Sequence, residues 1–287
     1  MVFLTFLGMF TNQYVPIWMK DNENKHMNQV IGELSSMKSG VDMQIIASNQ
    51  MVASAPIYSP IQLHAEGVPV FATPTMGQLT LTGVTTSGGS SFSLKYNYTS
   101  GDVTRTLDKS SGAYSGGSLE FYGPNRYFVQ QIVAYENGAI ILNQSDGEVV
   151  LAGIAMKVTP SGSGNQVLIT FTSLSGENKT IGGFGTKSVT TSVDYSSYTR
   201  VNNSISANCH NTLVISIDSK FGMAWYDYFN ASLKSTGIGT DDWNVIKPTT
   251  TPDMAAGYFS VAVVIRNVVS LEFTKAVTSV ELAEIGV

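Results

Sequence analysis

The sequence has little charge for its length and only one cysteine. Charged residues make up 13% of its 287 positions, and the 16 Lys and Arg form no cluster. Nucleic-acid binding is therefore excluded, because it depends on grouped basic residues that neutralise phosphates. A single cysteine, Cys209, excludes a disulfide framework. The three histidines, His26, His64 and His210, are too scattered to indicate a His-based metal centre.

The usual catalytic motifs are also missing. The sequence has neither the G-x-S-x-G motif of serine hydrolases nor the H-E-x-x-H motif of zinc proteases. Cys209 and His210 are adjacent, so in a strand they would point to opposite faces and could not act as a dyad. An extracellular hydrolase would need paired carboxylates, and Asp194, Asp218 and Asp227 show no pairing. We therefore expect a protein that is not an enzyme.

Two segments imitate ligand sites but lack the required spacing. Gly182–Ser188 is glycine-rich like a phosphate loop, yet its spacing differs and no helix is expected after it, which predicts a turn between strands. Asp241-Asp242 is not part of a D-x-D-x-D calcium loop. We expect no cofactor and no metal site.

What the sequence does contain is a polar surface made of hydroxyls and amides. Globular domains usually have about 25% charged residues, whereas this chain relies on Ser, Thr, Asn and Gly. Such surfaces are typical of secreted or cell-surface β proteins. The hydrophobic fraction of 43% is sufficient for a core.

The first ten residues are almost entirely apolar and uncharged. This character fades at residues 11–13 and returns at Val15, Ile17 and Trp18. As a helix, the first 18 residues would span roughly 27 Å, slightly less than the ~30 Å covered by the ~20 residues that usually cross a membrane. No basic residue precedes the apolar run and no small-residue cleavage site follows it, so we expect no cleaved secretory signal here. In water such a run requires apolar neighbours.

An amphipathic stripe follows the apolar run. Between residues 27 and 45, apolar side chains recur at steps of three and four, which places them on one helical face. Pro16 is expected to bend the helix. The sequence predicts one long helix over residues 1–47, which is an assembly helix, a membrane anchor with a stalk, or an ordinary core helix. For assembly the packing residues would be Val2, Phe3, Leu4, Phe6, Leu7, Phe10, Val15, Ile17, Trp18, Met27, Val30, Ile31, Leu34, Met37, Val41 and Ile45.

The rest of the chain has the texture of a β protein. Residues 48–78 contain four prolines (Pro56, Pro60, Pro69 and Pro74), which predict an extended connector with short edge strands. From residue 79 to 287, short β-rich segments alternate with Gly, Ser and Asn turns, which predicts a two-sheet β-sandwich. The expected fold class is α+β: a long N-terminal hydrophobic and amphipathic helix, then a mostly antiparallel β-sandwich with one short helix.

Three predictions within the β region are specific. Asn137-Gly138 and Asp146-Gly147 favour type I′ turns, so residues 127–154 are predicted to form a three-stranded antiparallel meander whose first strand is Tyr127–Tyr135. Further strands are expected at Lys179–Thr190, Val268–Thr274 and Val280–Glu284, among others. Met223–Ser235 is predicted to be the short helix, ended by Gly237.

Read as a whole, the chain resembles the archaeal type IV pilins and archaellin-like proteins, and most of all a group of archaeal pilin-like surface proteins. The resemblance covers nearly the whole chain and is carried by structural segments: Tyr14–Ile45, Glu66–Leu81, Tyr127–Ala152, Ala224–Leu233 and Val261–Phe273. It implies a subunit outside the cell, in a surface filament for adhesion or motility. Its partners would be other copies of itself through the N-terminal helices, and a membrane before assembly.

Surface glycans are a second expected kind of partner. Five N-x-[ST] sequons mark candidate N-glycosylation sites: Asn97, Asn143, Asn178, Asn202 and Asn230. Tyr195 with Tyr198, and Tyr122 with Tyr127, could stack on sugars, although such residues are more often packed in a core or an interface. The alternative to a filament subunit is therefore a membrane-anchored adhesin or carbohydrate-binding β-sandwich protein that does not polymerise.

Overall fold

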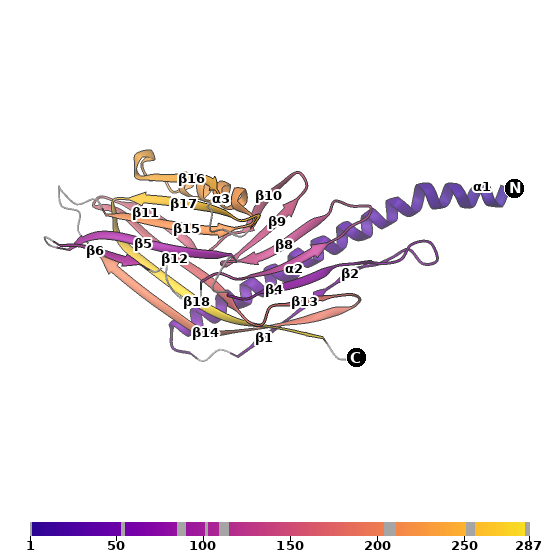
Figure 1. Ribbon diagram of the computed structural model, residues 1–287, viewed down its shortest axis with the longest axis horizontal. Coiled ribbons are helices and arrows are strands. Elements are labelled where there is room, and N and C mark those ends of the chain that lie inside the picture. Colours follow the sequence, from indigo (N-terminus) through magenta and orange to yellow (C-terminus); the bar gives the residue numbers. More distant parts are fainter. Residues whose placement is uncertain are drawn as a thin grey trace.

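The architecture is one long helical segment laid along a β domain (Figure 1). The structure is a computed structural model that describes residues 2–52, 55–84, 90–100, 103–108, 115–203, 211–250 and 256–284. The helical segment consists of α1 (Val2–Met9), a π-helical turn (Phe10–Tyr14) and α2 (Val15–Asn49). Its first part projects beyond the β domain, at the right of Figure 1, and the remainder runs along it. The expected α+β class is confirmed.

The π-helical turn lies directly before Pro16. Proline lacks an N–H and its ring crowds the carbonyl four residues earlier, so a regular α-helix cannot continue unchanged through this position. One helical turn instead contains an extra residue, because the N–H of Val15 bonds to the carbonyl of Phe10, five residues back. The predicted bend therefore takes the form of a π-bulge, and the helix continues to Asn49.

The amphipathic stripe of α2 packs on the chain's own β domain. Met27, Val30, Leu34 and Met37 are buried in a core with strands from two sheets, while Val41 and Ile45 pack with Ala276. The expectation that this stripe contributes to a bundle of helices from several copies is corrected here. Periodicity identified the buried face, but the face is covered within one chain. Only Ile31 of the stripe remains half-buried.

The β region contains three larger sheets and a two-stranded ribbon, rather than the two sheets expected. The first sheet has the order β1 (Ile57–Gln62), β14 (Thr186–Asn202), β18 (Val268–Glu284), β12 (Gly164–Ser175), β11 (Met156–Ser161). The second has β10 (Gly147–Ala152), β9 (Ala139–Gln144), β8 (Gln131–Glu136), β7 (Ser118–Gly123), β4 (Gln78–Thr82), β13 (Lys179–Gly182). The third has β16 (Trp243–Thr249), β17 (Phe259–Arg266), β15 (Thr212–Ser219), β5 (Ser91–Ser100), β6 (Val103–Asp108). The ribbon pairs β2 (His64–Ala65) with β3 (Thr75–Met76).

The β region has two large hydrophobic cores, whereas a single two-sheet sandwich would have one. One core lies around the third sheet, the helix α3 (Gly222–Ser235) and the N-terminal parts of β12 and β18. The other lies between α2, the second sheet, the beginning of β14 and the end of β18. The long strands β12 and β18 contribute residues to both cores, and β18 pairs in parallel with β12 and antiparallel with β14. Within the described residues, all other strand pairs are antiparallel.

The predicted meander is confirmed as β8–β9–β10, with two differences. Asn137 and Gly138 form the first turn at φ 53° and 95°, as a type I′ turn requires. In the second hairpin Gln144 pairs with Gly147, so the turn residues are Ser145 and Asp146 instead of Asp146-Gly147. The first strand begins at Gln131, not Tyr127, because the backbone N–H groups before it bond to a helix carboxylate described below.

Other boundaries also differ from expectation. The predicted strand Lys179–Thr190 is split into β13 and β14, since Gly183 and Gly185 adopt positive φ. Val268–Thr274 and Val280–Glu284 are one continuous strand, β18. The short helix is confirmed as α3, and Gly237 follows it at φ 76°. In the connector, β1 is an edge strand, as its proline Pro60 requires.

Candidate functional site

The N-terminal arm, residues 2–18, exposes a large apolar surface. Met9, Tyr14, Ile17 and Trp18 retain 56%, 52%, 63% and 45% of their accessible surface. Leu7 and Phe10 are half-buried, and Val15 is buried. The side chains of Val2, Phe3, Leu4 and Phe6 lie outside the described residues, although their backbone is helical. Exposed apolar side chains gathered on one projecting element mark an interaction surface.

An aromatic cluster stiffens the base of the arm. The ring of Phe10 lies 5.8 Å from Tyr14, 5.4 Å from Trp18 and 5.1 Å from Phe71, measured between centroids. Aromatic pairs at these separations contribute about 0.5–1.5 kcal/mol each beyond simple burial. The cluster joins the arm to a distant segment of the chain, because Phe71 belongs to the connector.

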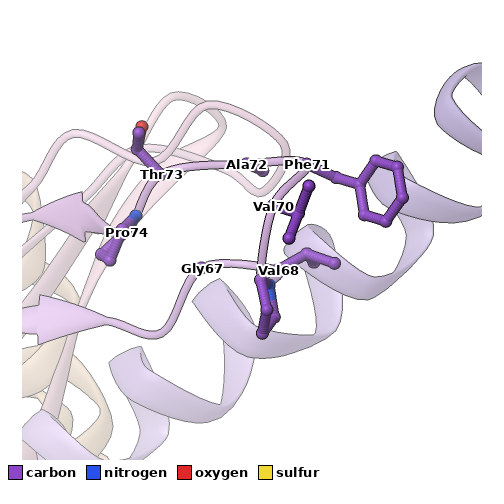
Figure 2. A pocket seen from close by; sticks show the side chains of 8 residues that line it. Gly67, Val68, Val70, Phe71, Ala72, Thr73 and Pro74 are labelled. Carbon is purple, nitrogen blue, oxygen red and sulfur yellow. The ribbon is translucent and has the colours of Figure 1, made fainter.

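That segment, residues 66–74 between β2 and β3, is named the arm loop. Val68 packs with Val15 and Met19 of the helix, and Ala72 lies against the same cluster. The loop lines a hollow of about 470 Å³. Figure 2 shows the loop curving around this hollow, with the ring of Phe71 pointing away from its centre. Both backbone hydrogen bonds between Val68 and Ala72, at 3.0 and 2.9 Å, close the loop.

Val70, at the tip of the arm loop, has an unfavourable backbone. It lies at the third position of the turn Val68–Phe71, with a φ of 71°, and its side chain is 100% exposed. Glycine is the usual residue at such a position, and a β-branched residue there is an outlier. The strain costs on the order of 1–2 kcal/mol. The chain thus holds an apolar side chain fully in solvent at a conformational cost, which is characteristic of a contact residue.

Glu23 fixes the helix to the β domain just below the arm. Its side chain is completely buried, and its two carboxylate oxygens accept four hydrogen bonds. Thr75 Oγ1 donates at 2.7 Å and the N–H of Arg126 at 3.0 Å to one oxygen. The N–H groups of Tyr127 and Phe128 donate at 2.8 and 2.7 Å to the other. These donors compensate a buried charge that would otherwise be costly.

A second set of polar contacts continues along α2. His26 Nε2 lies 2.8 Å from the carbonyl of Gln62, and Glu33 accepts the N–H of Gln62 at 2.9 Å. Burial lowers the pKa of His26 below its ordinary value, which outweighs the opposite effects of Gln62 and Glu33. Asn22 donates to the carbonyl of Glu66 at 3.0 Å. The helix is therefore held by β1 and the arm loop at the point where it leaves the domain.

Charge returns immediately beyond the arm. Lys20, Asp21 and Lys25 are exposed, and Lys25 pairs with Asp21 at 2.6 Å. Trp18 thus marks the boundary between an apolar segment and a charged one. No helix among the described residues combines the length and the apolar character needed to cross a membrane.

The predicted assembly residues whose side chains the structure describes differ in their surroundings. Val15 is buried against the arm loop, Leu7 is half-buried on α1, and Ile31 is half-buried against the core of α2. Phe10, Ile17 and Trp18 are at least partly accessible on the arm, where assembly through them stays a prediction. Met27, Val30, Leu34, Met37, Val41 and Ile45 belong to the chain's own cores. Sequence reasoning missed Glu23 and the arm loop. The Pro69-Val70 dipeptide between Val68 and Phe71 could have indicated a turn with apolar side chains at this place.

The five sequons occupy different environments, and their glycosylation stays a prediction. Asn97, Asn178 and Asn202 are exposed, and each uses its side-chain oxygen as an acceptor, from Thr106, Gly83 and Ser270. The Ser204 of the Asn202 sequon lies outside the described residues. Asn143 is half-buried on β9, and Asn230 on α3 donates its side-chain N–H to the carbonyl of Tyr226.

The other candidate residues do not converge on a catalytic site. Cys209 and His210 lie outside the described residues. Asp242 accepts hydrogen bonds from Asn267 at 2.7 Å and Asn165 at 3.3 Å, so it joins three segments. Of the glycine-rich segment Gly182–Ser188, residues 183–185 form the predicted turn, while Gly182 ends β13 and Thr186–Ser188 begin β14. Asp218 bonds to Ser91 and Asp194 to Ser175, apart from Asp227 on α3.

The aromatic pairs suggested for sugar stacking are exposed, and sugar binding by them stays a prediction. Tyr195 and Tyr198 lie on β14 at 58% and 53% exposure, while Tyr122 and Tyr127 are 36% and 41% exposed. Among the residues that the structure describes, no group of three His, Cys, Asp or Glu side chains is arranged to hold a metal ion. Comparisons with models of known families, with curated proteins and with solved structures find no match to this chain.

Proposed function

We propose that this protein is a structural subunit of an archaeal type IV pilus-like filament on the cell surface, serving adhesion or motility. The N-terminal arms pack together in the filament and the β domains lie outside. The observation that carries the proposal is the arm itself: a helical, exposed, apolar segment held rigidly at its base by the buried Glu23 and the arm loop. The protein has no catalytic role in this proposal.

Burial of the exposed surface near the arm is comparable in free energy to the cost of association. Fully burying a large apolar side chain contributes roughly 1.5–3 kcal/mol. From the exposed fractions of Met9, Tyr14, Ile17, Trp18, Val70 and Phe71, complete burial of these side chains would contribute about 5–11 kcal/mol. Association costs about 4–15 kcal/mol. Stable association in the proposed filament therefore depends on the further apolar residues of α1, and deletion of residues 1–10 is expected to leave a chain that no longer polymerises.

The shape of the subunit favours an open polymer over a closed dimer. The arm projects from one end of the molecule, away from the third sheet at the other end (Figure 1). In a bundle of arms, each arm packs one of its faces on a different face of the next arm. Such a contact is heterologous, and heterologous contacts repeat into rings or helical filaments.

The test compares two substitutions on one helix. Ile17 on the arm and Ile46 near the end of α2 are 63% and 58% exposed. Ile17→Asp places a charge in the proposed interface and is expected to abolish filaments in negative-stain microscopy, whereas Ile46→Asp, the matched control, retains them. Filaments of uniform diameter formed equally by the Ile17→Asp chain, or by a chain lacking residues 1–10, would overturn the proposal.

The alternative, a membrane-anchored surface adhesin that does not polymerise, has one supporting observation. Tyr14, Trp18 and Phe71 lie between the apolar α1 and the charged residues Lys20 and Asp21, which is where aromatic side chains gather at a membrane surface. Vesicle flotation separates the two functions: the adhesin floats with lipid and never forms filaments after release by detergent. The filament subunit polymerises once lipid is removed.

A further inference from the structure

A cleft in the β domain lies between the β9–β10 turn and the beginning of α3, and is named the α3 cleft. It has a volume of about 730 Å³, within the range of small-molecule sites, roughly 300–1,000 Å³. One side consists of polar side chains around the turn, including Asn143 and Asp146. The other side is apolar and consists of Met223, Pro248 and Phe259.

The apolar side is held in place by α3. A Cβ atom on Gly222 would lie only 2.8 Å from the Cβ of Phe259 and 3.1 Å from that of Pro248, so the helix backbone packs directly against both residues. Glu148 of β10 accepts the N–H of Ala224 at 2.9 Å, in the first turn of α3. These contacts join the two sides, and the cleft needs little rearrangement to receive a ligand.

Two carboxylates in the cleft remain available to a ligand. The ammonium group of Lys220 lies 3.0 and 3.2 Å from the carboxylate oxygens of Glu120, so its charge is balanced within the protein. Glu148 is engaged with α3. Asp146 and Asp227 are exposed, and neither side-chain carboxylate has a hydrogen bond within the described part of the chain. The charged groups left to face a ligand are therefore carboxylates, beside the neutral polar side chains of Asn143, Gln144 and Ser145.

We propose that the α3 cleft binds a neutral saccharide. A pyranose ring has an apolar C–H face and a rim of hydroxyls. The apolar face fits Phe259 and Met223, which are 37% and 47% exposed, and the hydroxyls donate to the carboxylates of Asp146 and Asp227. The negative charge of the cleft disfavours uronic acids, sulfated sugars and nucleotides. This site differs from the exposed tyrosine pairs, and it does not depend on filament assembly.

The saccharide could come from two sources. Asn143, one of the five sequons, lines the cleft, so a glycan attached to it lies within reach of the same side chains. Alternatively, the glycan belongs to another molecule. The chemistry recognised is the same, and the two sources are separated by removing the sequon.

The experiment uses the full chain produced without glycosylation and the probes maltose, cellobiose, N,N′-diacetylchitobiose and digalacturonate. Titration calorimetry and ligand-observed NMR are expected to show binding of at least one neutral disaccharide and none of digalacturonate. Phe259→Ala and Asp227→Asn should each weaken that binding about tenfold or more. Phe184→Ala and Asp194→Asn, matched exposed residues outside the cleft, should leave it unchanged.

The glycosylated protein then identifies the source. If an attached glycan fills the cleft, the wild-type chain rejects the added disaccharide and the Asn143→Gln chain accepts it. If the ligand comes from elsewhere, both bind equally. The proposal is overturned if no neutral disaccharide of the panel binds the unglycosylated chain at about 10 mM. It is also overturned if the control variants lose as much affinity as the cleft variants while all remain folded by thermal unfolding.

Discussion

Replacing Glu23 is the most direct test of how the arm is held. Each carboxylate oxygen accepts two hydrogen bonds, from Thr75 and Arg126 on one side and from Tyr127 and Phe128 on the other. Glu23→Gln keeps one acceptor oxygen and turns the other into an NH₂ group, which faces two donors. A buried donor without a partner costs about 1–3 kcal/mol, so we expect a loss of about 2–4 kcal/mol in the free energy of unfolding.

The assay combines urea denaturation with site-resolved hydrogen exchange. Protection of the amides of Arg126, Tyr127 and Phe128 is expected to fall in the Glu23→Gln chain, because these amides lose or share their acceptor. The control is Glu33→Gln on the same helix. Glu33 accepts the N–H of Gln62 on one oxygen and the exposed side-chain amide of Gln29 on the other. A glutamine oxygen can keep the bond to Gln62, and the Gln29 amide can bond to water instead, so we expect a loss below about 1 kcal/mol. Equal losses for the two variants, with unchanged exchange at the three amides, would refute the reasoning.

Four further outcomes can be measured. Burial raises the pKa of Glu136 to about 7, above its ordinary 4.5. The free energy of unfolding should therefore fall by about 3 kcal/mol as the pH rises from 4.5 to 7. Glu136→Gln should remove that decline in urea titrations across this pH range. Burial lowers the pKa of His26, so its effect has the opposite sign: stability is lost as pH falls below about 6.5, and His26→Gln should reduce that loss. Gly138→Ala, at φ 95°, should cost about 1–2 kcal/mol in thermal unfolding, whereas Gly162→Ala, with open space around it, should cost less than about 1 kcal/mol. Val70→Gly should raise the unfolding free energy by about 1 kcal/mol and yet weaken filament formation measured by sedimentation; a gain in both would contradict a contact role.

Local signals in the sequence were sufficient to predict several elements. The three- and four-residue spacing from Met27 to Ile45 identified the buried face of α2, and Asn137-Gly138 identified the first hairpin of the meander. These patterns work because each depends on residues close together in the chain. Periodicity does not reveal what covers an apolar face, and for this reason the stripe was assigned to other copies of the chain when its own sheets cover it.

Features that depend on distant contacts could not be predicted. Glu23 lies within a run of polar residues, and nothing near it in the sequence indicates that the amides of Tyr127 and Phe128, more than 100 positions later, meet its carboxylate. The same contact explains why β8 begins at Gln131. The α3 cleft likewise unites β9, α3, β16 and β17, which only the fold brings together.

The rigidity of the arm has a consequence for assembly that differs from its effect on folding. The arm extends roughly 25 Å from its base at 1.5 Å per residue, so a small rotation at Glu23 becomes a large displacement at Val2. A segment already held in its docking direction loses less conformational entropy on association than a loose one. In the proposed filament, Glu23 therefore favours assembly although it contacts no neighbouring copy. Under conditions where the fold remains intact, the Glu23→Gln chain should polymerise more slowly than the Glu33→Gln chain, and equal rates would show that the arm finds its orientation in the filament and not in the free subunit.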